Sequence, residues 1–150
     1  MTDWEWGKLK DELEKRKFKK YGRFEFNEDS KIKHKLDYIA KQKENKAKRI
    51  YLWVLIRENR LGNIIYIGKA GRTIKERMGQ HREGFKGNGN GGSKSGGEKF
   101  AFIKNQIENK RTNKLVVWAK EVSDYTKVER QEIEYWQEQK NYWLYLNKIT

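Results

Sequence analysis

The sequence predicts an α+β domain: a small, mostly antiparallel three-stranded sheet flanked by helices, with a helical N-terminal extension. Three segments rich in β-branched and aromatic residues are typical of strands, at residues 49–58, 64–68 and 114–122. Three further segments space their apolar residues as amphipathic helices do, at residues 73–83, 98–109 and 124–140. From residue 49 onward the order is therefore β-β-α-α-β-α, which suits helices packed on a small sheet.

The first two strands form a hairpin that leads directly into a helix. Alternation places Tyr51 and Trp53 on one face of the first strand. The same rule puts Ile64, Tyr66 and Gly68 together on one face of the second strand. The next helix has a cap of its own, because Thr73 is a suitable N-cap and Glu76 follows three residues later.

Residues 1–48 are expected to form a basic helical extension, and residues 49–150 the main domain. Leu9 and Leu13 lie on one stripe of a first helix, and residues 22–26 alternate like a short strand. A second helix is predicted with Ile32, Leu36 and Ile39 on one stripe. The extension either packs on the core as an amphipathic hairpin or reaches out as a DNA-contacting arm, and both roles stay open.

The charge balance points to a polyanionic partner. There are 35 Lys and Arg residues against 21 Asp and Glu residues, a net charge of +14, so nucleic acid is the first expectation. No apolar run approaches the length of a membrane span, so no membrane association is expected. Cysteine is absent, which excludes disulfides and thiolate metal sites and fits a reducing compartment, the cytoplasm. With only two histidines, any metal site must use oxygen ligands, which suits Mg²⁺.

Two polar side chains on the helix after the hairpin are candidates for chemistry. Arg77 and His81 are four residues apart and share a face, and Tyr66 ends the strand that leads into this helix. Arginine can hold a phosphate through two parallel hydrogen bonds, and histidine can move a proton. Each residue alone is also compatible with an ordinary surface arginine and a core histidine.

A carboxylate is predicted in the apolar stripe of the last helix. Glu132 falls at the middle of that stripe, whereas Glu129 lies toward its flank. A buried carboxylate is costly unless it is paired or bound to a metal. Glu132 is therefore either an ion-pair partner of a nearby Lys or Arg, or a Mg²⁺ ligand at the bottom of a cleft.

The Gly-rich segment 84–99 lacks the ordered spacing of a phosphate-binding P-loop. It is read either as a flexible connector or as a DNA-contacting loop through Lys94 and Ser95. Candidate phosphate-binding residues over the whole chain are Lys69, Arg72, Lys75 and Lys94.

These motifs resemble the GIY-YIG nuclease superfamily. Residues 66–68 read YIG, and the segment KAGRTIKERMGQH resembles the helix that follows in the family. In the first motif, RIY at residues 49–51 stands where the family has Gly-Ile-Tyr. A competing alignment uses YLW and puts Trp53 in the place of Tyr51. The resemblance covers roughly residues 49–147 and leaves residues 1–48 outside.

The resemblance implies an Mg²⁺-dependent (or Mn²⁺-dependent) DNA endonuclease that leaves 5′-phosphate and 3′-hydroxyl ends. It implies a catalytic set made of Tyr51, Tyr66, Arg77, His81, Glu132 and Asn147. Glu132 would bind the metal, with Glu129 as the rival. Asn147 would support the last helix or the glutamate. A restriction-like or phage-type nuclease is the expected setting, in which double-strand cleavage needs either a homodimer or two successive binding events.

Two other functions remain open at this point. One is a catalytically inactive nucleic-acid-binding module, which the degenerate first motif favours. The other is an interaction protein that inhibits a nuclease by resembling its fold.

Overall fold

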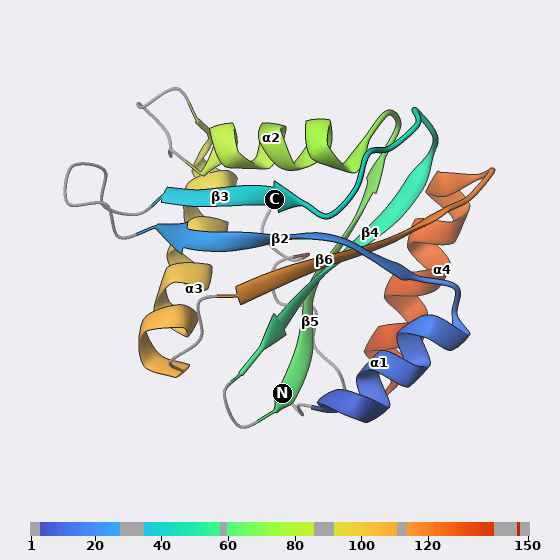
Figure 1. Ribbon diagram of the computed structural model, residues 1–150, viewed down its shortest axis with the longest axis horizontal. Coiled ribbons are helices and arrows are strands. Elements are labelled where there is room, and N and C mark those ends of the chain that lie inside the picture. The colour runs from blue at the N-terminus through green and yellow to red at the C-terminus, as the bar shows by residue number, and fades with distance from the viewer. Residues whose placement is uncertain are drawn as a thin grey trace.

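A computed structural model describes residues 4–27, 35–57, 60–85, 92–110, 114–139 and 147. Its six strands form one sheet in the order β1-β5-β4-β6-β2-β3, and every neighbouring pair is antiparallel (Figure 1). In chain order the elements are β1 (Trp4–Glu5), α1 (Trp6–Lys15), β2 (Lys19–Asn27), β3 (Lys35–Ala40), β4 (Arg49–Ile56), β5 (Leu61–Ala70), α2 (Ile74–Gly84), α3 (Lys94–Lys110), β6 (Lys114–Glu121) and α4 (Tyr125–Glu138).

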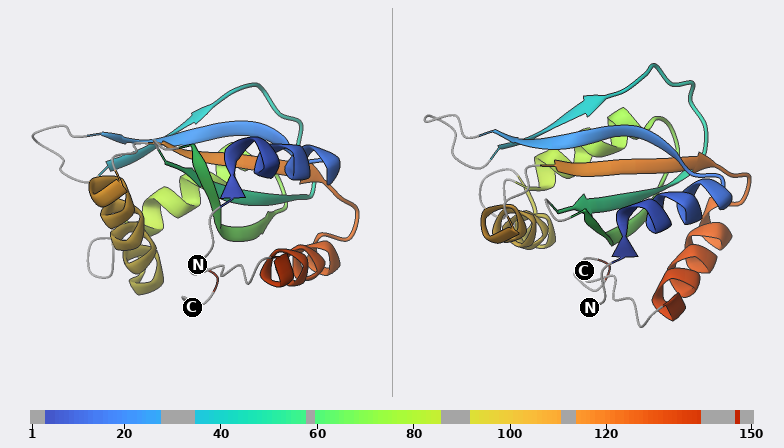
Figure 2. Two further views of the ribbon diagram at one scale, coloured as in Figure 1. Left: turned by 90° about the horizontal axis from the view of Figure 1, so that it is seen from below. Right: turned by 60° about the horizontal axis from the view of Figure 1, so that its bottom comes forward.

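The sheet has a hydrophobic core on each face. On one face, α2 and α3 pack over a cluster that includes Tyr51 and Trp53 of β4. On the other face, α1 and α4 lie side by side over a cluster that includes Ile50 and Leu52 of the same strand (Figure 2). Strand β4 is thus buried on both faces, because successive side chains point to opposite sides.

The predicted α+β class and the element order after residue 49 are both confirmed. Strands β4 and β5, helices α2 and α3, strand β6 and helix α4 follow one another as β-β-α-α-β-α. The number of strands was wrong, since the sheet has six strands rather than three. The three additional strands all come from the segment that the sequence assigned to a helical extension.

That segment is not an arm in its described part. Strand β2 pairs with β6 on one side and with β3 on the other, so it lies inside the sheet. The predicted second helix is wrong over residues 35–40, which form the edge strand β3, whereas Ile32 lies outside the described residues. Tyr38 of this strand packs edge-on against Phe24 of β2, at 5.5 Å between ring centroids. Pairing with β2 thus overrides the helical spacing of the apolar residues.

A bulge in the hairpin changes which side chains of β5 share a face. The pairing of β4 with β5 shifts between Trp53 and Val54, which lie opposite Tyr66 and Ile64. As a result, Ile64 joins the cluster on the α4 face, whereas Tyr66 packs on the α2 face. The simple alternation that placed Ile64 with Tyr66 was therefore wrong, because the extra residue of the bulge turns the side chains on its two sides to opposite faces of the sheet.

Helix α2 begins at a well-satisfied N-terminus. Thr73 caps it by accepting from the backbone N–H of Glu76 at 3.0 Å, as the sequence predicted. The carboxylate of Glu44 accepts from the first two N–H groups of the helix, at 2.7 and 3.1 Å. Glu44 also pairs with the buried Arg49 at the start of β4, at 3.4 Å. These contacts fix the end of α2 against the strand that carries Tyr51.

Candidate active site

The first pair of the site joins strand β4 to helix α2. The Tyr51 hydroxyl lies 2.6 Å from Nε2 of His81, and both side chains are buried. Tyr51 stands opposite Gly68 across the two strands. A Cβ at Gly68 would lie 2.4 Å from the Tyr51 hydroxyl oxygen, so only glycine leaves room for this ring.

Tyr51 rather than Trp53 occupies the site. The Trp53 side chain is fully buried and its indole N–H donates to the sulfur of Met78 at 3.3 Å. Trp53 therefore packs in the core beneath the site, with its ring 4.6 Å from the ring of His81. Of the two alignments of the first motif, the geometry supports the one that uses Tyr51.

Arg77 is the electrostatic centre of the group. Its positive charge acts on the pKa values of five side chains, which are Tyr51, Tyr66, His81, Lys99 and Glu129. A charge changes the pKa only of groups that lie near it, so these five side chains all lie near the Arg77 guanidinium. Helix α2 therefore presents Arg77 toward the β4–β5 hairpin and α4.

Burial keeps the core of this site neutral. It raises the pKa of the Tyr51 hydroxyl well above its usual value; Tyr66 adds to the rise and Arg77 opposes it. Burial lowers the pKa of His81 to about 2, with help from the positive charges of Arg77 and Lys99. The hydrogen bond between Tyr51 and His81 thus joins two uncharged groups at ordinary pH.

Lys99 belongs to the site, although the sequence did not single it out. Its ammonium lies 4.6 Å from the ring centroid of Tyr66. Burial, and then Arg77, lower the pKa of Lys99. No pattern in the sequence marks this residue, because the Gly-rich segment before it hides where α3 begins. Helix α3 in fact starts at Lys94 and carries Lys99 back over the hairpin.

Glu129 of α4 is a carboxylate on which the charges of this group act. Burial raises its pKa, while the nearby charges of Lys69 and Arg77 oppose the rise. Its charge in turn helps to raise the pKa of Tyr66. Among the described residues it has neither a hydrogen bond nor an ion pair, so its oxygens are available to a ligand.

Glu132 is buried as the sequence predicted, but its carboxylate is already fully engaged. It receives two hydrogen bonds from Arg16 of α1, at 3.0 and 2.5 Å. Lys120 donates at 3.3 Å and the indole of Trp136 at 3.2 Å. Of the two roles that the sequence left open for Glu132, the structure shows the ion-pair partner. The expectation that it binds metal has no support from this geometry.

Asn147 supports a strand rather than a helix or a glutamate. Its side-chain oxygen accepts from the N–H of Ile67 at 2.9 Å, and its side-chain nitrogen donates to the Ile67 carbonyl at 2.7 Å. The side-chain amide thus forms the two hydrogen bonds that the backbone of a neighbouring strand would form with Ile67, on the outer edge of β5. It holds the backbone midway between Tyr66 and Gly68.

The predicted phosphate-binding residues lie at three places: Lys69 on β5, Arg72 and Lys75 at the start of α2, and Lys94 at the start of α3. Lys69 donates to the Thr126 hydroxyl at 3.0 Å, and its positive charge opposes the rise that burial causes in the pKa of Glu129. Arg72 is exposed and pairs with Glu76 at 2.9 Å, and Lys75 is exposed on the first turn of α2. Lys94 is exposed at the start of α3. Only Lys69 is joined to the group around Arg77.

The sequence model of the GIY-YIG catalytic domain matches residues 38–146. The chain belongs to the GIY-YIG family. The family consists of nucleases, so the site described above is that of a nuclease-family protein with a nucleic acid substrate. The match begins within β3 and therefore includes β4, β5 and α4, which carry Tyr51, Tyr66 and Glu129. Neither the curated proteins nor the solved structures contain a match to this chain.

Within the described residues, no helix is long and apolar enough to cross a membrane.

Proposed function

We propose that this GIY-YIG protein is an Mg²⁺- or Mn²⁺-dependent DNA endonuclease. One observation carries the proposal: the Tyr51–His81 pair lies beside Arg77 and Tyr66, and the charge of Arg77 acts on the carboxylate of Glu129. A proton-transfer pair, a phosphate-binding cation and an available carboxylate are the parts that phosphodiester hydrolysis needs.

The donor set fits a single hard cation that shares its coordination with the substrate. No group of three or more His, Asp or Glu side chains gathers anywhere in the described ranges. Mg²⁺ is commonly held by one or two carboxylates, waters and substrate phosphates, so one available carboxylate is sufficient. We assign that role to Glu129, because Arg16, Lys120 and Trp136 already occupy Glu132. When bound, the metal supplies Lewis-acid stabilisation of the phosphate and of the departing oxygen.

The chain's own residues divide the remaining work. Arg77 holds the phosphate and stabilises the negative charge that grows on its oxygens during attack by water. As the new P–O bond forms, the Tyr51 hydroxyl takes the water proton and passes its own proton along their hydrogen bond to Nε2 of His81, which is neutral beforehand and becomes the imidazolium. The bond to the 3′ oxygen breaks, which leaves a 5′-phosphate and a 3′-hydroxyl. Lys99 and Lys69 add positive charge beside the reacting phosphate.

One such site cuts one strand at a time. A monomer is then expected to convert supercoiled plasmid first to nicked circles and only later to the linear form. A homodimer with two sites on opposite strands would produce linear plasmid early. The time course of plasmid forms therefore tests the oligomeric state together with the activity.

The decisive experiment compares two glutamate variants in a plasmid-nicking assay with Mg²⁺. Glu129→Gln is expected to lose nicking by at least about 100-fold. It should stay about as stable as the wild type, because Glu129 forms no hydrogen bond or ion pair with the described residues. Glu132→Gln is expected to unfold more easily, yet to nick plasmid at temperatures where it remains folded. Arg77→Ala is expected to lose activity as Glu129→Gln does.

Two results would contradict this proposal. If Glu132→Gln is folded but inactive and Glu129→Gln is active, the metal ligand is Glu132 after all. If the wild type nicks no plasmid with Mg²⁺ or Mn²⁺ but still binds DNA, the protein is a binding module with an inactive site.

A further inference from the structure

A hollow of about 510 Å³ lies on the α1 side of the sheet, away from the candidate active site. It is bounded by α1, by the start of β2 and by the segment after β3. Its lining is mostly basic and aromatic: Trp6, Lys10, Glu14, Phe18, Lys19, Lys20, Lys41, Gln42 and Trp118. Four lysines against one glutamate make it strongly positive.

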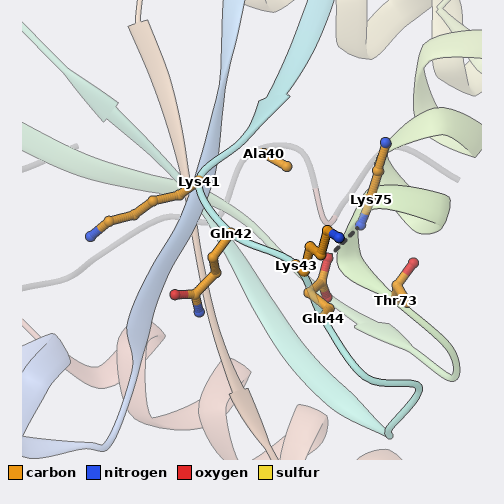
Figure 3. A pocket seen from close by; sticks show the side chains of 7 residues that line it. All are labelled: Ala40, Lys41, Gln42, Lys43, Glu44, Thr73 and Lys75. Carbon is orange, nitrogen blue, oxygen red and sulfur yellow. Dashed lines mark hydrogen bonds between the residues drawn. The ribbon is translucent and has the colours of Figure 1, made fainter.

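A second hollow of about 460 Å³ adjoins the first turn of α2 and shares Lys41 and Gln42 with the first hollow. Figure 3 shows Lys43, Glu44 and Lys75 gathered on one side of it, with Lys41 extending away from them. The two hollows are therefore neighbours that meet at Lys41 and Gln42. We call their six lysines the lysine surface: Lys10, Lys19, Lys20, Lys41, Lys43 and Lys75.

Most of the positive charge of this surface has no ion-pair partner among the described residues. Glu44, in the second hollow, is already engaged by the N-terminus of α2 and by Arg49. In the part of the chain that the structure describes, five of the lysine ammoniums form no ion pair, those of Lys10, Lys19, Lys41, Lys43 and Lys75. Unpaired like charges held close together repel one another, so an anionic partner is favoured there.

One residue of the wall of the first hollow, Trp118, also contains a buried hydrogen-bond donor. The indole N–H of Trp118 is buried and has no acceptor among the described residues. The lysine ammoniums that line the hollow are donors without acceptor capacity. The occupant that suits such a lining is therefore rich in acceptor oxygens, as a phosphate is.

We propose that the lysine surface binds the phosphate backbone of nucleic acid outside the segment that is cleaved. This inference rests on the proposed function for the identity of the partner. Lys75 and Arg77 are two residues apart on α2 and so lie on opposite flanks of the helix. A strand whose phosphate is held by Arg77 thus continues over the first turn of α2 toward Lys75 and Lys41. Lys10, Lys19 and Lys20 precede the family match, so the N-terminal part of the chain supplies half of the six lysines.

The test measures binding without cleavage, by fluorescence anisotropy of a short labelled DNA duplex in EDTA at several salt concentrations. Lys19→Glu/Lys41→Glu is the test variant. Lys8→Glu/Lys46→Glu is its control, because it makes the same change of charge at exposed lysines that line neither hollow. The test variant is expected to bind at least about tenfold more weakly, with a salt slope lower by about two. The control is expected to change affinity much less.

Equal losses in the two double variants would overturn the proposal, because only total charge would then matter. Binding by the test variant at wild-type affinity would overturn it as well. A second readout is the indole N–H resonance of Trp118, assigned through Trp118→Phe, which is expected to shift when the duplex is added and to stay fixed in the test variant.

The two proposals fail in different ways. If the wild type binds duplex through these lysines but never nicks plasmid, the nuclease proposal fails and the lysine surface stands. If the test variant nicks saturating plasmid as fast as the wild type but with a raised KM, both proposals hold.

Discussion

At the scale of single residues, the site depends on how closely two strands approach. The Tyr51 ring lies against Gly68, so the glycine of the YIG motif is required because a larger residue would leave no space for this ring. The hydroxyl of Tyr51 then meets His81 in a buried and uncharged pair. Both features follow from packing rather than from the chemistry of either residue alone.

Gly68→Ala is therefore expected to destabilise the protein by about 1–3 kcal/mol, because the new methyl group overlaps the buried Tyr51 ring. Gly79→Ala in α2 is the matched control. A Cβ there meets nothing within 4 Å, and alanine favours helix, so this variant should gain about 0.5–1 kcal/mol. Urea unfolding of both variants checks the prediction, and equal effects would contradict the close approach at Gly68.

His81 is expected to make the protein sensitive to acid. The ordinary pKa of histidine is 6.5, and burial lowers the pKa of His81 to about 2 in the folded state. Between these values the unfolded chain binds a proton that the folded chain does not, so stability falls as the pH is lowered from 6.5 toward 2. The loss should be up to about 1.4 kcal/mol per pH unit more in the wild type than in His81→Gln. Urea titrations at several pH values measure it, and parallel pH profiles would refute it.

At the scale of elements, the site depends on helices being held in place by charged residues from elsewhere. Arg49 is 2% exposed and links Glu44, Glu121, the Tyr21 hydroxyl and two backbone carbonyls. Glu44 in turn holds the N-terminus of α2, which carries Arg77 and His81. The other helix of the site, α4, is fastened to α1 through Glu132 and Arg16.

Arg49 has two acidic partners, and we expect the loss of one to destabilise the protein much more than the loss of the other. Glu44→Ala leaves a buried guanidinium and two helix N–H groups short of a partner, and is expected to cost about 3–5 kcal/mol. The side chain of Glu121 is 65% exposed, so Glu121→Ala should cost less than about 1 kcal/mol. Thermal unfolding of the two variants measures the difference. Similar costs would mean that Glu44 is not the anchor of α2.

At the scale of the whole molecule, the N-terminal residues complete the fold. Leu9 and Leu13 of α1 are fully buried in the core on the α4 face, and β2 is an inner strand of the sheet. The part of the chain before the family match therefore contributes to stability as well as to charge. An arm that only contacted DNA would contribute to charge alone.

Leu13→Ala tests this integration. The change is expected to cost about 2–5 kcal/mol, because it leaves a cavity beneath α1 that the packed neighbours cannot fill. Lys8→Ala on the exposed face of the same helix should change stability by no more than about 0.5 kcal/mol. Denaturant midpoints provide the comparison, and a small effect of Leu13→Ala would return the segment to the status of an arm.

The sequence predicted those parts of the fold that depend on local pattern. The strands around Tyr51 and Tyr66, the cap at Thr73 and the burial of Glu132 all follow from alternation, capping preferences and helical spacing. It failed for β3, because the pairing partner of an edge strand lies elsewhere in the chain. It could not mark Lys99 or Glu44 either, because both become significant only through residues that are distant in sequence.

By itself, the sequence determined the chemistry at hand: a tyrosine pair, an arginine and a histidine around one strand-to-helix junction, in a strongly basic α+β protein. Only the tertiary structure decided which glutamate lies among the charges of that junction. Glu129 and Glu132 lie about one helical turn apart on the same side of α4. Helical spacing could therefore predict which of the two is more buried, but not which side chains surround each carboxylate. The charges that meet each carboxylate come from other elements: Arg77 and Lys69 act on Glu129, and Arg16 and Lys120 bind Glu132.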